Sequence, residues 1–217
     1  MRRVPHPWAA HRRAGAFAVT GTRIQTRNRA AIREAALEVF SRQGFGGATL
    51  DAIAGEAGLS KPNLLYYYPS KEAIYEDLLT GLLATWLDPL IALDPAGDPV
   101  EELLAYMRRK LDLSRQMPRE SRLFAGEILR GAPVMMGHLT WELQRLVSEK
   151  SDLIETWAAE GRIAPVDGRQ TIISIWALTQ HYADFDVQVR AVLGDTDPFD
   201  SAATHLDALF RRMLSVR

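Results

Sequence analysis

Hydrophobic residues recur every three or four positions along most of this chain, which is the spacing of amphipathic helices. No stretch alternates apolar and polar residues as a half-buried strand would. The pattern predicts an all-α fold of about nine helices, with limits set by caps, glycines and prolines. The predicted helices cover residues 28–43, 49–57, 60–68, 71–87, 98–117, 119–130, 134–160, 167–193 and 197–214.

The stretch from Gly47 to Tyr75 differs from the rest because it holds three helix starts and two tight turns within 29 residues. Thr49, Ser60 and Ser70 each precede a helical pattern and are expected to be N-caps. Gly58 is expected to end the first of these helices. The middle helix is then only about two turns long, so its neighbours must hold it in place.

The short middle helix carries polar and aromatic residues where a core helix would carry leucine and alanine. Lys61, Asn63, Tyr66 and Tyr67 lie on it, and Lys71 follows shortly after it. This layout is typical of a helix-turn-helix, whose second helix enters the major groove of DNA. We therefore predict DNA binding, with an ordinary helical corner of an all-α core as the alternative.

The predicted contacts with bases lie at the N-terminus of the short helix. Lys61 is expected to reach a base edge or a phosphate, Pro62 a thymine methyl group, and Asn63 a base or a phosphate. One such helix covers about four or five base pairs, so a two-fold dimer is expected to read two half-sites about 34–36 Å apart, or a multiple of that distance.

The predicted phosphate contacts lie at helix ends around the short helix. Thr49, Tyr67 and Lys71 are expected to bind phosphates and so set the register of the protein on DNA. Tyr66 is also assigned to the DNA surface, although packing on the first helix would explain it equally well. Tyr68 is assigned to the core.

Charge is distributed unevenly along the chain. The net charge is −1, but residues 1–75 carry +6 and residues 76–217 carry −7. A basic N-terminal part, here called the head, joined to an acidic remainder, here called the body, is expected of a protein that binds a polyanion. Residues 1–24 are rich in arginine and broken by prolines and glycines, so they are expected to form a flexible basic arm. A merely solvated charge run is the alternative for the arginines there.

Other classes of protein find little support in the sequence. There is no cysteine, no apolar run of membrane-spanning length and no apolar signal core, which fits the cytoplasm. The five histidines lack metal-ligand spacing, and no nucleophile or phosphate-loop motif is present, so we expect no catalytic residues, no metal and no enzyme. A purely structural helical adaptor would leave Lys61, Asn63 and Lys71 without a role.

Several motifs of the head resemble the tetracycline-repressor (TetR) family of transcriptional regulators. They are Thr49, Gly58-Leu59-Ser60, Leu65-Tyr66-Tyr67-Tyr68 and Ser70-Lys71-Glu72. The resemblance implies a three-helix DNA-binding domain at residues 25–72. It also implies a larger helical domain at residues 73–217, which binds a small molecule and forms a homodimer through its last two helices.

The body resembles one branch of that family, the regulators of pyrimidine utilisation. The matching segments include Trp86-Leu87, Ser121-Arg122-Leu123-Phe124, Glu149-Lys150-Ser151, Ile175-Trp176-Ala177 and residues 179–185. This resemblance implies a repressor that senses uracil or thymine and has no other cofactor. A repressor with the same head and a different flat or hydrophobic ligand is the alternative.

Five residues are candidates for the effector site. An indole ring can stack on a flat heterocycle, and an amide offers the donor and acceptor that a uracil ring requires. With the resemblance, this assigns Trp86, Trp176 and Gln180 to the ligand. Lys110 and Glu127 are further polar candidates, for which an internal Lys–Glu pair is the alternative.

The last two predicted helices hold more apolar residues than one buried face each would need. Such an excess predicts a dimer interface, because a monomer would leave it exposed to water. The residues are Ile172, Ile173, Ile175, Val187, Val189, Val192, Leu206, Leu209, Phe210 and Leu214.

Overall fold

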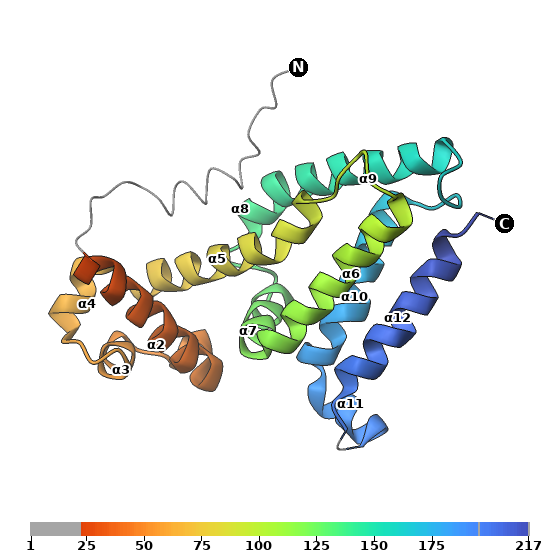
Figure 1. Cartoon of the computed structure of the whole chain (residues 1–217). Coiled ribbons are helices and arrows are strands. Elements are labelled where there is room, and N and C mark those ends of the chain that lie inside the picture. The colour runs from red at the N-terminus through yellow and green to blue at the C-terminus, as the bar shows by residue number, and fades with distance from the viewer. Residues whose placement is uncertain (1–22, 195, 217) are drawn as a thin grey trace.

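The computed structural model describes residues 23–194 and 196–216. The predicted basic arm therefore lies outside the described residues, except for Arg23 and Ile24, which begin the first helix. All regular elements in the described ranges are helices (Figure 1). None of these helices has the length and the apolar character that crossing a bilayer would require.

Three helices at one end of the molecule form the head (Figure 1). They are α2 (Arg23–Gly47), α3 (Leu50–Glu56) and α4 (Lys61–Tyr67). The regular part of α2 ends as predicted at Gly44, whose φ of 66° only glycine adopts readily. Ile32, Ile53 and Leu64 are fully buried between the three helices, so α4 is held by apolar contacts on one side.

The predicted caps of the head are confirmed. The Thr49 hydroxyl accepts a hydrogen bond from the amide of Ala52 at 3.1 Å, and the Ser60 hydroxyl accepts one from Asn63 at 3.4 Å. Gly58 separates the two helices with a φ of 66°. Each cap satisfies an amide that the first turn of a helix leaves without a partner, which fixes where the short helices begin.

The long helix α5 (Lys71–Ile91) leaves the head and enters the body, which also holds the remaining helices (Figure 1). These are α6 (Pro99–Gln116), α7 (Pro118–Leu129), α8 (Met136–His138), the short π-helix η1 (Leu139–Leu143), α9 (Gln144–Ala159), α10 (Gly168–Asp184), α11 (Asp186–Leu193) and α12 (Pro198–Leu214). The helix α6 packs on α5, α10 and α12, and α7 packs on both α2 and α10.

The single helix predicted for residues 167–193 is interrupted. Phe185 has a φ of −116° and a ψ of 33°, which separates α10 from α11. The break coincides with contacts from α7: Ser121 donates to the Asp184 carboxylate at 2.5 Å, and Arg122 donates to the carbonyl of Ala183 at 3.2 Å. These bonds join the last turn of α10 to α7 at the point where α10 ends.

Candidate DNA-binding and effector sites

The predicted reading face of α4 is exposed. Lys61, Pro62, Asn63 and Tyr66 are all open to solvent, while Leu64 on the opposite side is buried. The short helix therefore presents a row of polar and aromatic side chains on a supported backbone. This is the geometry that a helix needs to enter a DNA groove.

Lys61 has a partner within the head. Its ammonium lies 2.8 Å from a carboxylate oxygen of Asp51, in the first turn of α3. Both side chains are largely exposed, so the pair is worth at most about 1 kcal/mol and exchanges easily with another anion. The geometry holds Lys61 at the start of α4, where it was predicted to reach DNA.

Tyr66 and Tyr67 connect the end of α4 to the beginning of α2. Gln25 donates to the Tyr66 hydroxyl at 3.3 Å, and Asn28 donates to the Tyr67 hydroxyl at 2.9 Å. The rings of the two tyrosines meet edge to face at 5.2 Å. Both hydroxyl groups keep the capacity to bind a phosphate, and Tyr66 is 70% exposed.

The beginning of α2 adds residues that the sequence analysis did not assign to DNA. Arg29 is exposed, and its guanidinium lies 5.2 Å from the centre of the Tyr68 ring and 5.9 Å from that of Tyr67. Arg23 and Arg27 are also exposed on this turn. The net positive charge of residues 1–75 was the signal that pointed to them, but only the fold places them beside α4.

Lys71 has a structural role that the sequence did not reveal. Its ammonium donates to the carbonyl groups of Phe45 at 2.8 Å and Ala48 at 2.9 Å, and lies 4.5 Å from the centre of the Phe45 ring. These contacts tie the turn between α2 and α3 to the start of α5. An ammonium has three N–H donors, so one remains for a phosphate.

Tyr68 belongs to the core, as predicted. It is 5% exposed, and its hydroxyl donates to the Asp77 carboxylate at 2.6 Å. Burial, with Asp77 nearby, raises the pKa of Tyr68 to about 12. The tyrosine therefore stays neutral and links α4 to α5.

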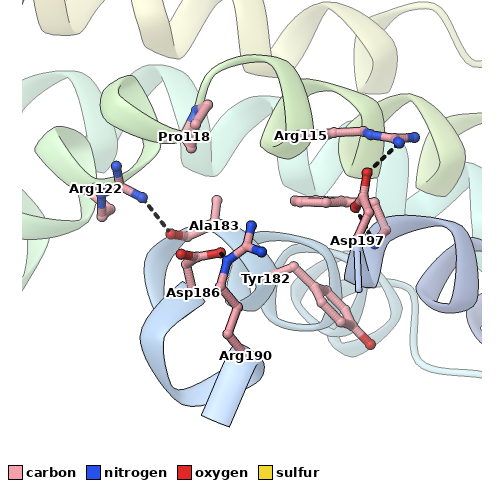
Figure 2. Close-up of a pocket in the computed structure, with 9 residues that line it drawn as sticks. Arg115, Pro118, Arg122, Tyr182, Ala183, Asp186, Arg190 and Asp197 are labelled. Atoms are coloured by element: carbon pink, nitrogen blue, oxygen red, sulfur yellow. Dashed lines mark hydrogen bonds and ion pairs between the residues drawn. The ribbon is translucent and has the colours of Figure 1, made fainter. Parts of the chain in front are cut away.

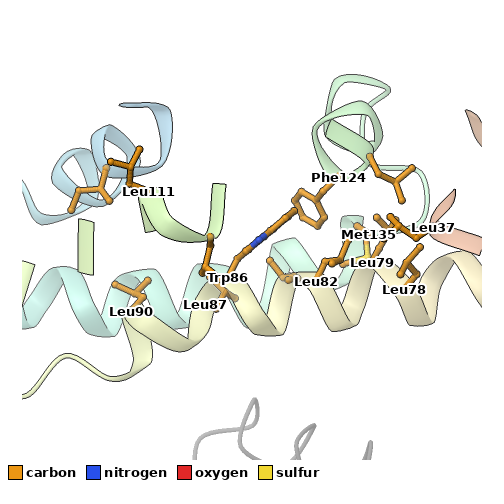
Figure 3. Packing of buried hydrophobic residues seen from close by; sticks show 14 of the residues in the cluster. Leu37, Leu78, Leu79, Leu82, Trp86, Leu87, Leu90, Leu111, Phe124 and Met135 are labelled. Carbon is orange, nitrogen blue, oxygen red and sulfur yellow. The ribbon is translucent and has the colours of Figure 1, made fainter. Parts of the chain in front are cut away.

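Two of the predicted effector residues meet in the body. Trp86 is 5% exposed, its ring meets Phe124 edge to face at 5.0 Å (Figure 3), and the Lys110 ammonium lies 5.6 Å from its ring centre. Burial lowers the pKa of Lys110 to about 8, and Asp184 partly opposes this shift by its charge. Burial raises the pKa of Asp184 itself, although Ser121 and Lys110 act against the shift.

The other candidates are placed differently. Trp176 is half-buried, and its indole N–H donates to the Tyr106 hydroxyl at 2.5 Å. Gln180 is half-buried one helical turn later on α10, so it shares a side of the helix with Trp176. The indole N–H of Trp176 is therefore engaged by the protein, and its ring face is what it can offer to a ligand.

Glu127 is held by groups of the protein itself. Its carboxylate accepts hydrogen bonds from the amides of Val134 at 2.7 Å and Met135 at 3.3 Å, and from the Tyr75 hydroxyl at 3.3 Å. Arg130 also donates to it at 3.3 Å. The structure does not pair Glu127 with Lys110, so the internal Lys–Glu pair considered as an alternative is wrong, and the carboxylate orders the turn after α7.

Some of the apolar residues predicted for the dimer interface are buried within a single chain. Ile172, Ile175, Val189, Leu206, Phe210 and Leu214 are buried in the described monomer, so the argument from excess was wrong for these six. Five of them lie on α10 and α12, which α6 covers from one side, and Val189 lies on α11, which packs on α10 and α12. Four residues stay exposed: Ile173, Val187, Val192 and Leu209.

Comparisons with known proteins identify the family. Residues 32–78 match the family described as "Bacterial regulatory proteins, tetR family", and residues 79–217 match "YcdC-like protein, C-terminal region". The chain belongs to the TetR family of bacterial transcriptional regulators. It is therefore a DNA-binding regulator rather than an enzyme, and the two matched regions divide within α5.

Relatives of this TetR-family regulator include the HTH-type transcriptional regulator RutR of Escherichia coli K12. The two are 48% identical over 184 residues, which cover 84% of this chain and 87% of RutR. A regulator IcaR of the biofilm operon icaADBC in Staphylococcus aureus is 44% identical over 41 residues, 19% of this chain and 22% of IcaR.

Solved structures of the family share the fold. A bacterial regulatory protein of the tetR family from Rhodococcus RHA1 superposes with a TM-score of 0.71 at 21% identity, over 88% of this chain and 98% of that one. AibR in complex with isovaleryl coenzyme A and operator DNA gives a TM-score of 0.61 at 19% identity, over 84% of this chain and 97% of that one. At these identities the likeness concerns the fold alone.

Proposed function

We propose that this regulator is a cytoplasmic, homodimeric repressor of pyrimidine-utilisation genes whose effector is uracil or thymine. The DNA half of the proposal uses α4 as the reading helix. Lys61, Pro62 and Asn63 face the bases, and Thr49, Tyr66, Tyr67 and Lys71 contact the backbone around them. The exposure of α4 beside the arginines at the start of α2 supports this assignment.

One observation carries the effector half: the Lys110 ammonium lies against the Trp86 ring in a buried part of the body. An indole surface suits a flat ring, and an ammonium is a strong donor to a ring carbonyl. Trp176 and Gln180 on α10 are the remaining contacts of this proposal. Glu127 contributes by ordering the turn after α7.

The similarity to RutR supports the pyrimidine class, because it extends over 184 residues and therefore includes the body as well as the head. A different flat or hydrophobic ligand for the same head is the competing assignment. Purine binding distinguishes the two assignments, because a pyrimidine site discriminates against a purine by size and by hydrogen-bond pattern.

The third part of the proposal concerns the dimer, in which α10 and α12 pack against the same helices of a second copy. The large apolar residues that these two helices leave exposed are Ile173, Leu178, Leu209 and Met213. Two copies related by a two-fold axis would cover them and would present two α4 helices to two half-sites.

Thermal unfolding with uracil, thymine and adenine tests the effector. A ligand at 100 times its dissociation constant stabilises the folded protein by about 2.7 kcal/mol, and we expect this only for the pyrimidines. The Trp86→Phe protein should lose most of the response. Trp141→Phe is the matched control, because Trp141 is 79% exposed in η1. An equal response to adenine would assign the site to another ligand class.

A gel-shift assay on the DNA upstream of the gene tests the regulator. We expect specific binding at moderate salt that weakens when uracil is added, with Trp86→Phe resistant to that release. Binding that is weak and equal on unrelated DNA would refute the regulatory half. Tight DNA binding without any pyrimidine response would refute only the effector assignment.

A further inference from the structure

A slot of about 460 Å³ lies between the α6–α7 turn and the corner where α10 meets α11 (Figure 2). Its lining includes Pro118, Arg122, Tyr182, Arg190 and Phe199. None of the residues proposed for the pyrimidine effector lines it. The volume lies within the range of about 300–1,000 Å³ that is usual for small-molecule sites.

One end of the slot has cationic groups with unused donors. Within the described residues, the Arg122 guanidinium makes one hydrogen bond, to the carbonyl of Ala183 at 3.2 Å. Arg190 uses its Nε on Asp186 at 2.8 Å, and its terminal nitrogens are not part of that bond. A guanidinium has five N–H donors, so both side chains can bind an anion without breaking these contacts.

The other end carries one more carboxylate than guanidinium. Arg115 pairs with Asp197 and, at 3.0 Å, with Asp200, and its guanidinium lies 5.9 Å from the centre of the Phe199 ring. At the Arg122 end, Arg122 and Arg190 face one lining carboxylate, Asp186, and the charge of nearby Asp184 is shared with Lys110, which leaves one positive charge uncompensated. The electrostatics therefore favour a single negative charge there.

The middle of the slot suits a flat ring. Tyr182 and Phe199 have ring centroids 6.0 Å apart and planes inclined by 48°, and Pro118 projects from the opposite wall (Figure 2). Aromatic and proline surfaces bind planar apolar groups. Guanidinium groups bind carboxylates through paired, parallel hydrogen bonds.

We propose that this slot is a second small-molecule site, which binds a planar aromatic carboxylate. The carboxylate lies at Arg122 and Arg190, and the ring lies between Pro118, Tyr182 and Phe199. The site is separate from the proposed pyrimidine site and does not depend on the identity of that effector. It adjoins the contact between α7 and the end of α10, where Arg122 holds the Ala183 carbonyl.

Isothermal titration calorimetry on the full chain tests the proposal with benzoate as the probe. Benzamide has the same shape without the charge, and inorganic phosphate has charge without the ring. At constant ionic strength we expect saturable binding of benzoate at millimolar concentration, with benzamide and phosphate at least about tenfold weaker. Equal binding of benzamide or phosphate, or no binding of benzoate, would overturn the proposal.

Variants locate the bound probe. Arg122→Gln should weaken benzoate binding about tenfold, because a charge-assisted pair is lost. Arg109→Gln, which removes an exposed arginine from α6, should leave it unchanged. If Arg122→Gln does not fold, Arg190→Gln gives the same comparison. Unchanged affinity in the folded variant, or competition between benzoate and uracil, would overturn a separate site at this position.

Discussion

The Lys110 ammonium lies over the Trp86 ring, 5.6 Å from its centre, although lysine is 3% exposed at this position. Removing an ammonium from water is costly unless its charge is compensated. The charge of Asp184 opposes the cost only in part, since burial still lowers the pKa of Lys110 to about 8. A buried cation of this kind is more readily explained by a ligand that it contacts than by stability.

Lys110 should make stability depend on alkaline pH. Its pKa falls from 10.5 in the unfolded chain to about 8 in the folded one, so between these values the unfolded chain binds the additional proton. The free energy of unfolding should therefore rise with pH from about 8 to 10.5, on the order of 3 kcal/mol, while below pH 8 the cost of burial remains. Urea unfolding should show that Lys110→Met removes this rise; an unchanged pH profile would contradict it.

The ion pair between Lys61 and Asp51 should restrain DNA binding. An incoming phosphate must displace or share the Asp51 carboxylate, which also repels it. We expect Asp51→Asn to raise affinity severalfold on operator and unrelated DNA alike, and to increase the salt slope by about one. Fluorescence anisotropy at several salt concentrations measures both quantities.

Glu56→Gln is the matched control for that experiment. It removes the same charge from α3, but Glu56 pairs with Arg42 at 2.9 Å and not with Lys61. A similar rise in both variants would mean that net charge alone is responsible. In an Asp51→Asn/Lys61→Gln double variant, the gain should disappear.

Arg119 should transmit effector binding to the head. It lies on α7 and donates to Glu38 at 2.7 Å and to Glu34 at 2.9 Å, both on α2. These exposed bonds are worth little in stability, below about 1 kcal/mol. We expect Arg119→Gln to keep uracil affinity while the change that uracil causes in DNA affinity falls severalfold, measured by titrating DNA with and without uracil.

Arg211→Gln serves as the comparison for Arg119. Arg211 forms a similar pair of bonds, to Glu101 at 2.6 Å and Asp207 at 2.7 Å, but entirely within the body. Its loss should not alter the coupling. Equal effects in the two variants would indicate a general loss of rigidity, and no effect in either would place the coupling in α5.

Leu209 should be required for dimerisation. It is 40% exposed on α12, so a charge there is tolerated in a monomer but not in an apolar interface. Sedimentation at micromolar concentration should show Leu209→Glu as a folded monomer. Leu129→Glu, at the 83% exposed end of α7, should remain dimeric. A dimeric Leu209→Glu protein would place the interface elsewhere.

The sequence by itself determined the helical class and the limits of the head. Thr49, Ser60 and Gly58 act through bonds to residues within a few positions, so their effect is local and visible in the order of residues. Helical spacing alone likewise places Leu78, Leu82 and Trp86 on one side of α5, and all three are buried. Local interactions of this kind need no knowledge of the partner element.

Only the tertiary structure decided which distant groups meet. At the break before Phe185, Ser121 and Arg122 of another helix bond to the last turn of α10, and the Glu127 carboxylate accepts a hydrogen bond from Tyr75, 52 residues away on α5. Helical periodicity predicts on which side of a helix an apolar residue lies, but not whether that side packs against the same chain or against a second copy. That is why Ile175 and Phe210, expected at a dimer interface, are found in the core, while Ile173 and Leu209 stay exposed.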